Sequence, residues 1–246
     1  NMYGGVIKNN TAKNGGAFFS TTGGTINMTG GTISGNKATQ NSNNAGGGAI
    51  YLNQEPSWLI MQGGEISGNT ATGNGGVYIY RSGSVCQLYS GKIENNKASG
   101  NGGGIYINPS NSGQLKVGNK PLVQNNSVSG KANNVYLPSG KTMTIEIGMS
   151  TGAAIGVTTA DTSYPVAFSN AYDRDYAKCF FADDANAHVE YQDDRKLYLV
   201  SGAVARPLTV TFDPNGGTLA DADKTRSLTT GDTYGTLPVP DYEGYD

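Results

Sequence analysis

The residues that could support acid–base catalysis are sparse in the first 160 positions of this 246-residue chain. That stretch contains no Asp, and its four carboxylates are Glu55, Glu65, Glu94 and Glu146. Enzymes that cleave glycosidic bonds need two carboxylates flanking the bond, or carboxylates that bind calcium beside a base. We assign Glu65 and Glu94 to the same repeat position, immediately before the inward Ile, and expect them on adjacent coils of the outer face. Because nothing in water separates the pKa values of such a pair, we interpret it as surface charge near Lys92 and expect no catalytic residue.

Histidine, cysteine and the acidic pairs predict no further site. The single histidine, His188, lies beside an acidic run, so we interpret it as a surface residue. Cys86 and Cys179 lie far apart in sequence, which predicts neither a disulfide framework nor a zinc site. The pairs Asp183-Asp184 and Asp193-Asp194 lack the Asp-x-Asp-x-Asp-Gly spacing of a calcium loop and are expected in turns. We therefore expect no metal and no cofactor.

An aromatic residue recurs between aliphatic residues at five places, and these rings are the best candidates for ligand binding. In a strand with its aliphatic side chains inward, the residue between them faces outward. Exposed rings in a row could bind sugar rings or an apolar patch of a partner. Alternatively, the rings stack on one another and stabilise the fold, and both roles can hold together. The five residues are Phe19, Tyr51, Tyr78, Tyr106 and Tyr136.

These rings belong to a pattern that recurs five times in the first 140 residues. It reads Gly-Gly-x-Ile-x-x-Asn-x-Ala, then a polar stretch, then Gly-Gly-aliphatic-Tyr-aliphatic, and a third alternating run such as Ile26 and Met28 lies between copies. The aligned aliphatic positions 7, 33, 66, 93 and 123 are 26, 33, 27 and 30 residues apart. Fixed strands joined by turns of variable length explain this spread. Each repeat thus offers three short strands.

Strands this short cannot bury an apolar face alone, so the repeats must wind into coils that stack. The sequence predicts an all-β chain with a right-handed parallel β-helix over residues 1–160, three strands per coil and glycine corners. One asparagine aligns in every repeat, and frequency of Asn in loops does not explain this registration. We expect a ladder of side-chain amides hydrogen-bonded from coil to coil. Its members are Asn10, Asn36, Asn69, Asn96 and Asn126.

Charge is divided unevenly along the chain. Residues 1–160 carry ten Lys or Arg and four Glu, whereas residues 161–246 carry seven Lys or Arg and fifteen Asp or Glu. Neither part has the dense basic clusters that follow a phosphate backbone, so nucleic acid is not expected as a partner. No apolar run reaches membrane-spanning length. The opening Asn1 to Gly5 reads as the middle of a repeat, and we expect a processing boundary there.

The repeat resembles the β-helix repeats of large surface proteins and adhesins of gut-dwelling bacteria, and more loosely the polymorphic outer-membrane autotransporters. The resemblance covers residues 1–160, and in that family an aromatic, acidic segment follows the helix. Here residues 161–204 have this composition. We expect them to cap the solenoid, because an uncovered last coil would expose apolar core and unpaired strand edges.

The tail, residues 205–246, is similar to another module. Leu208 to Thr218 reads Leu-Thr-Val-Thr-Phe-Asp-Pro-Asn-Gly-Gly-Thr, which resembles the opening of the Listeria-Bacteroides repeat, or internalin B-repeat, a small β-grasp module. Tyr234 to Pro240 and Tyr242 to Tyr245 also match. The family continues with a Gly-Trp strand beyond the position of Asp246, so we expect a partial module. The resemblance implies an extracellular, multidomain parent protein.

Together these features favour a non-enzymatic adhesive or spacing module of a larger bacterial cell-surface protein. We expect it to be monomeric and extracellular, secreted or anchored, with a glycan or a host or bacterial surface protein as partner. The alternative is a carbohydrate-active β-helix, a polysaccharide lyase or hydrolase, whose active groove is incomplete in this segment. Ice binding would require a recurring Thr-x-Thr array, which the repeats lack.

Overall fold

The chain forms two compact units, residues 1–201 and residues 202–246. The structure, a computed structural model, describes all residues except 21–22, 203–206, 216, 222–223, 230–235 and 242–246. The predicted division at 204/205 lies close to the boundary between these units. The predicted division at 160/161 lies inside the first unit and stays a prediction.

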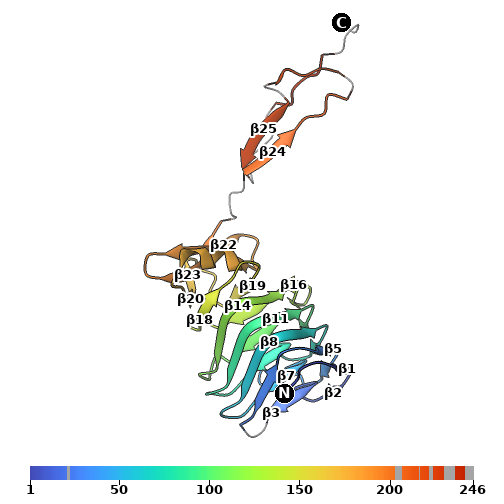
Figure 1. The fold of residues 1–246 in the computed structure, drawn as a ribbon, viewed down its shortest axis with the longest axis vertical. Coiled ribbons are helices and arrows are strands. Elements are labelled where there is room, and N and C mark those ends of the chain that lie inside the picture. Colours follow the sequence, from blue (N-terminus) through green and yellow to red (C-terminus); the bar gives the residue numbers. More distant parts are fainter. Residues whose placement is uncertain (21–22, 203–206, 216, 222–223, 230–235, 242–246) are drawn as a thin grey trace. The chain divides into compact units, whose positions relative to one another are not determined.

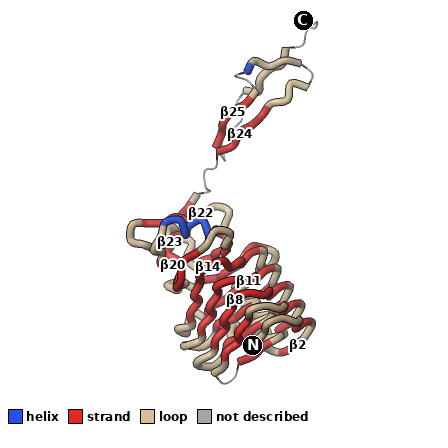
Figure 2. The backbone as a smooth tube through the Cα atoms, viewed as in Figure 1, coloured by secondary structure: helices blue, strands red, loops and turns tan. Residues whose placement is uncertain are grey.

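One coil of the first unit consists of three strands, as in β8 (Trp58–Ser67), β9 (Thr70–Ala71) and β10 (Val77–Ile79). Each strand pairs in parallel with the equivalent strand of the next coil, so that β8 pairs with β11 (Val85–Glu94). The stacked coils form a right-handed parallel β-helix of about 6 turns. Figures 1 and 2 show the long strands of these coils lying as successive rungs. The predicted fold class is confirmed.

The remaining strands of the solenoid repeat these three faces. The long-strand face contains β1 (Val6–Lys8), β4 (Thr25–Met28), β5 (Thr32–Ser34), β14 (Gln114–Gln124), β18 (Thr144–Met149) and the first residues of β19 (Ala154–Thr159), whose last residues pair with the tyrosine-bearing face. The two-residue face contains β2 (Thr11–Ala12), β6 (Lys37–Ala38), β12 (Lys97–Ala98), β15 (Ser127–Val128) and β16 (Lys131–Ala132). The tyrosine-bearing face contains β3 (Phe18–Ser20), β7 (Ile50–Leu52), β13 (Ile105–Ile107) and β17 (Val135–Leu137).

The three strands of a coil differ from the three runs expected from the sequence. The alternating run and the Gly-Gly-x-Ile run join into one ten-residue strand in β8 and in β11. The paired glycines bend this strand without ending it, since Gly64 has a φ of +79°. A Cβ at Gly64 would lie 2.6 Å from Cε of Met28 on the preceding coil. The third strand is instead the two-residue segment beside the ladder asparagine.

The interior consists of columns of like residues, one from each coil. Ile33, Ile66, Ile93 and Val123 lie in register and are fully buried. A second column joins Met28, Met61, Leu88, Val117 and Ile145. These contacts remove aliphatic side chains from water, which contributes roughly 25 cal/mol for each Å² of apolar surface buried. The solenoid is therefore stabilised mainly by contacts between coils.

A cap closes the C-terminal end of the solenoid. Strand β21 (Phe180–Ala182) pairs with β19, and a three-stranded antiparallel sheet contains β20 (Val166–Asn170), β23 (Lys196–Ser201) and β22 (Ala187–Gln192). Phe168, Leu197 and Leu199 of this sheet are buried in the same hydrophobic cluster as the last coils. The segment predicted to cap the solenoid therefore covers its apolar interior.

Helix contributes little to this chain. The cap contains η1 (Arg174–Cys179), a six-residue 3-10 helix. At its start, the backbone N–H of Asp175 donates to the Asp173 carboxylate at 2.9 Å. Within the described residues, none of the helices combines the length and apolar character needed to cross a membrane.

The second unit contains an antiparallel pair, β24 (Pro207–Thr211) and β25 (Thr225–Thr229). An isolated antiparallel bridge joins Thr218 to Asp241. The pattern predicted to be a Listeria-Bacteroides repeat spans this pair, and its residues 216, 234–235 and 242–245 lie outside the described residues. The β-grasp assignment stays a prediction.

Candidate functional site

A ladder of asparagine side chains runs along the solenoid in the predicted register. The Nδ2 of each amide donates to Oδ1 of the next, at 2.9 Å from Asn10 to Asn36, 2.9 Å from Asn36 to Asn69, and 2.9 Å from Asn69 to Asn96. Asn96 continues it to Asn126 at 3.0 Å. Each accepting oxygen also receives the backbone N–H of the preceding asparagine. Buried amides are thereby satisfied in every coil.

The ladder extends two residues beyond the predicted set. Asn126 donates to Oδ1 of Asn134 at 2.9 Å, and Asn134 donates from Nδ2 to Oδ1 of Asp183 at 2.5 Å. The Asn134 backbone N–H and the Thr158 hydroxyl donate to Oδ2 of Asp183 at 2.6 Å and 2.7 Å. A carboxylate accepts without needing to donate, so Asp183 ends a row of donors.

The electrostatics of Asp183 suit this terminal position. Burial raises the pKa of the Asp183 carboxyl, while the hydrogen bonds from Asn134 and Thr158 oppose that shift. From Asn36 onward, each ladder amide accepts at Oδ1 from the preceding asparagine and directs one N–H toward this end, so the amide dipoles favour a negative charge there. Asp183 therefore supports the end of the ladder.

The predicted aromatic column is present, but most of it is not exposed. Tyr51, Tyr78 and Tyr106 lie in register, with ring centroids 5.0 Å apart in both pairs. Phe19 extends the column at 5.2 Å from Tyr51, and Tyr136 extends it at 5.7 Å from Tyr106. The exposed fractions are 2% for Tyr51, 0% for Tyr78 and 7% for Tyr106, against 43% for Phe19. The expectation of an exposed aromatic face is therefore wrong for the three central rings.

Backbone segments from neighbouring turns cover these tyrosine rings. The Tyr51 hydroxyl donates to the carbonyl of Asn44 at 2.7 Å, and the Tyr78 hydroxyl donates to the carbonyl of Asn43 at 3.1 Å. The Tyr80 ring stacks on Tyr51 with centroids 5.4 Å apart. Burial raises the pKa of both Tyr51 and Tyr78 above the ordinary value. The rings stabilise the solenoid, which is the alternative that the sequence left open.

The expected pairing of Glu65 with Glu94 is wrong. Glu65 lies opposite Lys92 on the next coil, whereas Glu94 lies opposite Ser67. Glu65 comes immediately before the inward Ile66, whereas Glu94 comes immediately after the inward Ile93. The two carboxylates are therefore offset by two residues along the paired strands. The structure does not bring them together as an acid and base pair.

Glu146 is the solenoid carboxylate with the most partners. Its Oε1 accepts from Nζ of Lys116 at 2.7 Å, and its Oε2 accepts from Nε2 of Gln87 at 3.0 Å and from the Tyr89 hydroxyl. These hydrogen bonds, that of Lys116 first, hold the pKa of Glu146 below its usual value. Burial and the hydrogen bond to Glu146 raise the pKa of Tyr89 to about 12. Sequence reasoning missed this cluster, since its members come from three coils.

Other predicted residues lie apart from one another. His188 contacts Oε1 of Glu190 through Nε2 at 2.8 Å on the cap sheet. Glu55 lies exposed in the turn before β8, and Cys86 and Cys179 are buried free thiols. Among the described residues, no group of three His, Cys, Asp or Glu side chains is arranged to hold a metal ion.

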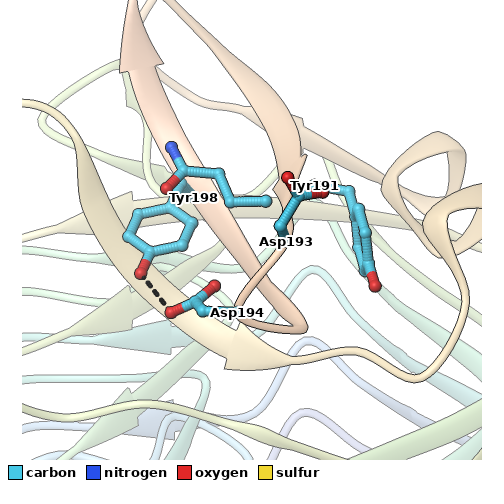
Figure 3. Close-up of a pocket in the computed structure, with 5 residues that line it drawn as sticks. Tyr191, Asp193, Asp194 and Tyr198 are labelled. Atoms are coloured by element: carbon cyan, nitrogen blue, oxygen red, sulfur yellow. Dashed lines mark hydrogen bonds between the residues drawn. The ribbon is translucent and has the colours of Figure 1, made fainter.

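A pocket of about 570 Å³ lies at the turn that joins β22 to β23. Figure 3 shows the side chains around it, including the hydrogen bond from the Tyr198 hydroxyl to Asp194, which measures 2.7 Å. Sequence reasoning placed Asp193 and Asp194 in a turn and did not connect them with the flanking tyrosines. The pocket is lined by Tyr191, Gln192, Asp193, Asp194 and Tyr198.

Comparisons with protein-family models, with curated proteins and with solved structures find no match to this chain.

Proposed function

We propose that this chain is a non-enzymatic, extracellular spacing and adhesive module of a larger bacterial cell-surface protein. The observation that supports a spacing role is the continuous ladder from Asn10 to Asp183. From Asn10 to Asn126 each step of the ladder joins two coils through side-chain hydrogen bonds, which are costly to break without replacement when they are buried. Coils joined in this way should bend and separate with difficulty, so the solenoid holds its ends at a fixed distance.

The extracellular, bacterial setting rests on resemblance alone. The five-fold repeat is similar to that of bacterial surface proteins, and the pattern from Leu208 to Thr218 is similar to the Listeria-Bacteroides repeat. Both families belong to secreted or surface-anchored multidomain proteins. Secretion of the full-length parent by its own host, measured by surface labelling of intact cells, tests this part of the proposal.

Single-molecule stretching of the intact chain tests the spacing role. If the ladder joins the coils, residues 1–201 should resist as one unit and extend in one large step. Asn69→Ala should lower the force of that step, because it removes a buried acceptor and a buried donor from the middle of the ladder. Asn53→Ala is the matched control, since the Asn53 side chain makes no hydrogen bond within the described residues. Coils that detach singly at low force would contradict a spacing role.

The second candidate is a polysaccharide lyase or hydrolase, and the Glu146 cluster is the observation that favours it. A carboxylate, a lysine and a tyrosine converge there on one sheet face. Against it, both Glu146 oxygens already accept hydrogen bonds, and the lowered pKa of Glu146 makes it a poor proton donor. We expect no turnover on a panel of neutral and acidic polysaccharides. Turnover that disappears in Glu146→Gln would establish the enzyme instead.

A further inference from the structure

We infer that the open end of the first coil is a docking surface for one further coil of this same repeat, which lies parallel to β1 and carries an asparagine. The inference rests on the proposed function in one respect, because the rest of the larger protein supplies that coil. Among the described residues, β1, β2 and β3 pair only with β5, β6 and β7. In Figure 1 they lie at the end of the solenoid marked N. Their outer edges therefore offer backbone donors and acceptors to another strand.

Asn10, the first member of the ladder, has an unused donor and an unused acceptor at this end. In the next four coils, Oδ1 accepts from the asparagine of the preceding coil, as it does at Asn69. Nδ2 also donates to a carbonyl of the preceding coil, as from Asn69 to Ile33 at 3.0 Å. Within the described residues, the Asn10 side chain makes only its hydrogen bond to Asn36. A further coil with an asparagine in register would complete both missing bonds.

The apolar columns of the interior also reach the surface at this end. Met2 lies opposite Met28 and Ile7 lies opposite Ile33. Met28 and Ile33 are 0% exposed, whereas Met2 and Ile7 of the first coil are only partly buried. Another coil would remove these two side chains from water as the first coil does for the second. That burial provides free energy for docking.

Gly4 is a glycine that contacts within the chain do not explain. At the equivalent Gly30 and Gly63, a Cβ would lie 2.4 Å from a carbonyl oxygen of the preceding coil, so close approach requires glycine there. In the fourth coil Ser90 stands before Gly91, and the strand register shifts beside it. At Gly4 nothing lies within 4 Å of the Cβ position, and its φ is outside the left-handed region. The approach of another coil accounts for the glycine.

A second copy of the whole chain fits this surface less well. If two first coils met face to face around a two-fold axis, β1 would pair antiparallel with its copy. That pairing does not reproduce the parallel register in which one ladder asparagine lies over the next. The other end of the solenoid is covered by the cap, and the Asp183 carboxylate there already accepts three hydrogen bonds. A single parallel coil of the repeat is therefore the occupant that matches the open end.

Titration of the full chain with a fluorescently labelled synthetic peptide of residues 63–79, followed by anisotropy, tests the surface. This peptide spaces its glycine pair, isoleucine and asparagine as the first coil does. We expect it to bind. The same peptide with Asn69→Ala should bind at least ten-fold more weakly, because it cannot donate to Oδ1 of Asn10.

Gly4→Val separates docking from folding. The space around Gly4 is open within the chain, so this variant should unfold at the wild-type temperature. It should nevertheless weaken peptide binding at least ten-fold, because the new side chain meets the docked coil. Ser110→Val, in the exposed turn between β13 and β14, is the control and should bind the peptide as the wild type does. If Gly4→Val unfolds earlier, Asn10→Ala provides the second variant, and unchanged affinity there would contradict the inference.

The remaining outcomes are equally decisive. Peptide binding that survives Gly4→Val in a stably folded chain, equal binding of the two peptides, or no binding would each overturn the inference. Analytical ultracentrifugation of the chain alone tests the second copy, and a dimer that Gly4→Val dissociates would assign the surface to that copy instead. None of these results alters the spacing role, because the stretching experiment measures the coils already present.

Discussion

Asp183 ends the side-chain ladder, and its substitution shows how much that end contributes. Asp183→Ala should lower the free energy of unfolding by about 2 kcal/mol, because two Asn134 donors and the Thr158 hydroxyl lose their acceptor. Chemical denaturation monitored by circular dichroism measures the change. Asp193→Ala is the control, since Asp193 is exposed and its carboxylate accepts no hydrogen bond within the described residues, and it should change stability by less than about 0.5 kcal/mol. Equal effects of the two substitutions would contradict a role in the ladder.

At the residue scale, the sequence predicted the ladder members that recur at one repeat position and missed the two members that do not. Five ladder asparagines align at one repeat position, and the hydrogen bonds follow that alignment. Asn134 follows Asn126 by only eight residues and stands at another repeat position, and Asp183 lies beyond the repeats. Periodicity does not identify Asn134 and Asp183. The chemistry could have done so, because a row of hydrogen-bond donors requires a final acceptor.

The buried tyrosine column makes the solenoid sensitive to alkaline pH. The pKa values of Tyr51 and Tyr78 are raised in the folded state, so above about pH 10 the unfolded chain releases protons that the native chain keeps. Stability must then fall as pH rises through that range. Tyr78→Phe should reduce this fall by up to about 1.4 kcal/mol per pH unit.

Denaturation at about pH 9 and about pH 11 measures that difference, within the range where an ordinary tyrosine ionises. The control, Tyr3→Phe, changes a ring that is 78% exposed. A Tyr78→Phe protein with the same pH dependence as the wild type would contradict the burial of Tyr78.

The glycine bend in the long strands can be tested with a pair of glycines. Gly64 and Gly140 have φ values of +79° and +70°, so alanine strains the backbone similarly at both. Only at Gly64 would the new Cβ meet neighbouring atoms, with Met28 Cε at 2.6 Å and the Gly31 carbonyl oxygen at 2.8 Å. Gly64→Ala should therefore destabilise by about 1–3 kcal/mol more than Gly140→Ala in thermal unfolding. Equal losses would show that the bend tolerates closer packing.

At the element scale, alternation predicted which way each side chain points, and turn length decided what covers it. Tyr51 and Tyr78 point away from the coil interior as expected. The spacing of 33 residues between Ile33 and Ile66, longer than the others, was interpreted only as a variable turn. In the structure that longer turn supplies the Asn43 and Asn44 carbonyls that receive the tyrosine hydroxyls. The long turn beside the aromatic column thus indicates that the tyrosine rings are covered.

At the scale of the whole molecule, the two compact units should be thermally independent. Residues 1–201 contain the solenoid coils and the cap, with one hydrophobic cluster through both. A chain ending at residue 201 should unfold at the same temperature as residues 1–201 of the full chain in differential scanning calorimetry. A clear fall in that temperature would show that residues 202–246 stabilise the first unit.

The solenoid could be predicted from the sequence because aligned positions of a repeat show which residues stack from coil to coil. The cap and the pocket at the β22–β23 turn occur once, so no alignment of repeats shows their arrangement. The spacing role depends on coils that are joined through their length. Hydrogen–deuterium exchange of the backbone amides of the ladder, read residue by residue by NMR, tests this most directly. Asn36, Asn69, Asn96 and Asn126 should exchange only as slowly as global unfolding permits, because each amide donates to the next side chain. Fast exchange at Asn69 or Asn96 in the native protein would contradict a continuous ladder, and the proposed rigid spacer with it.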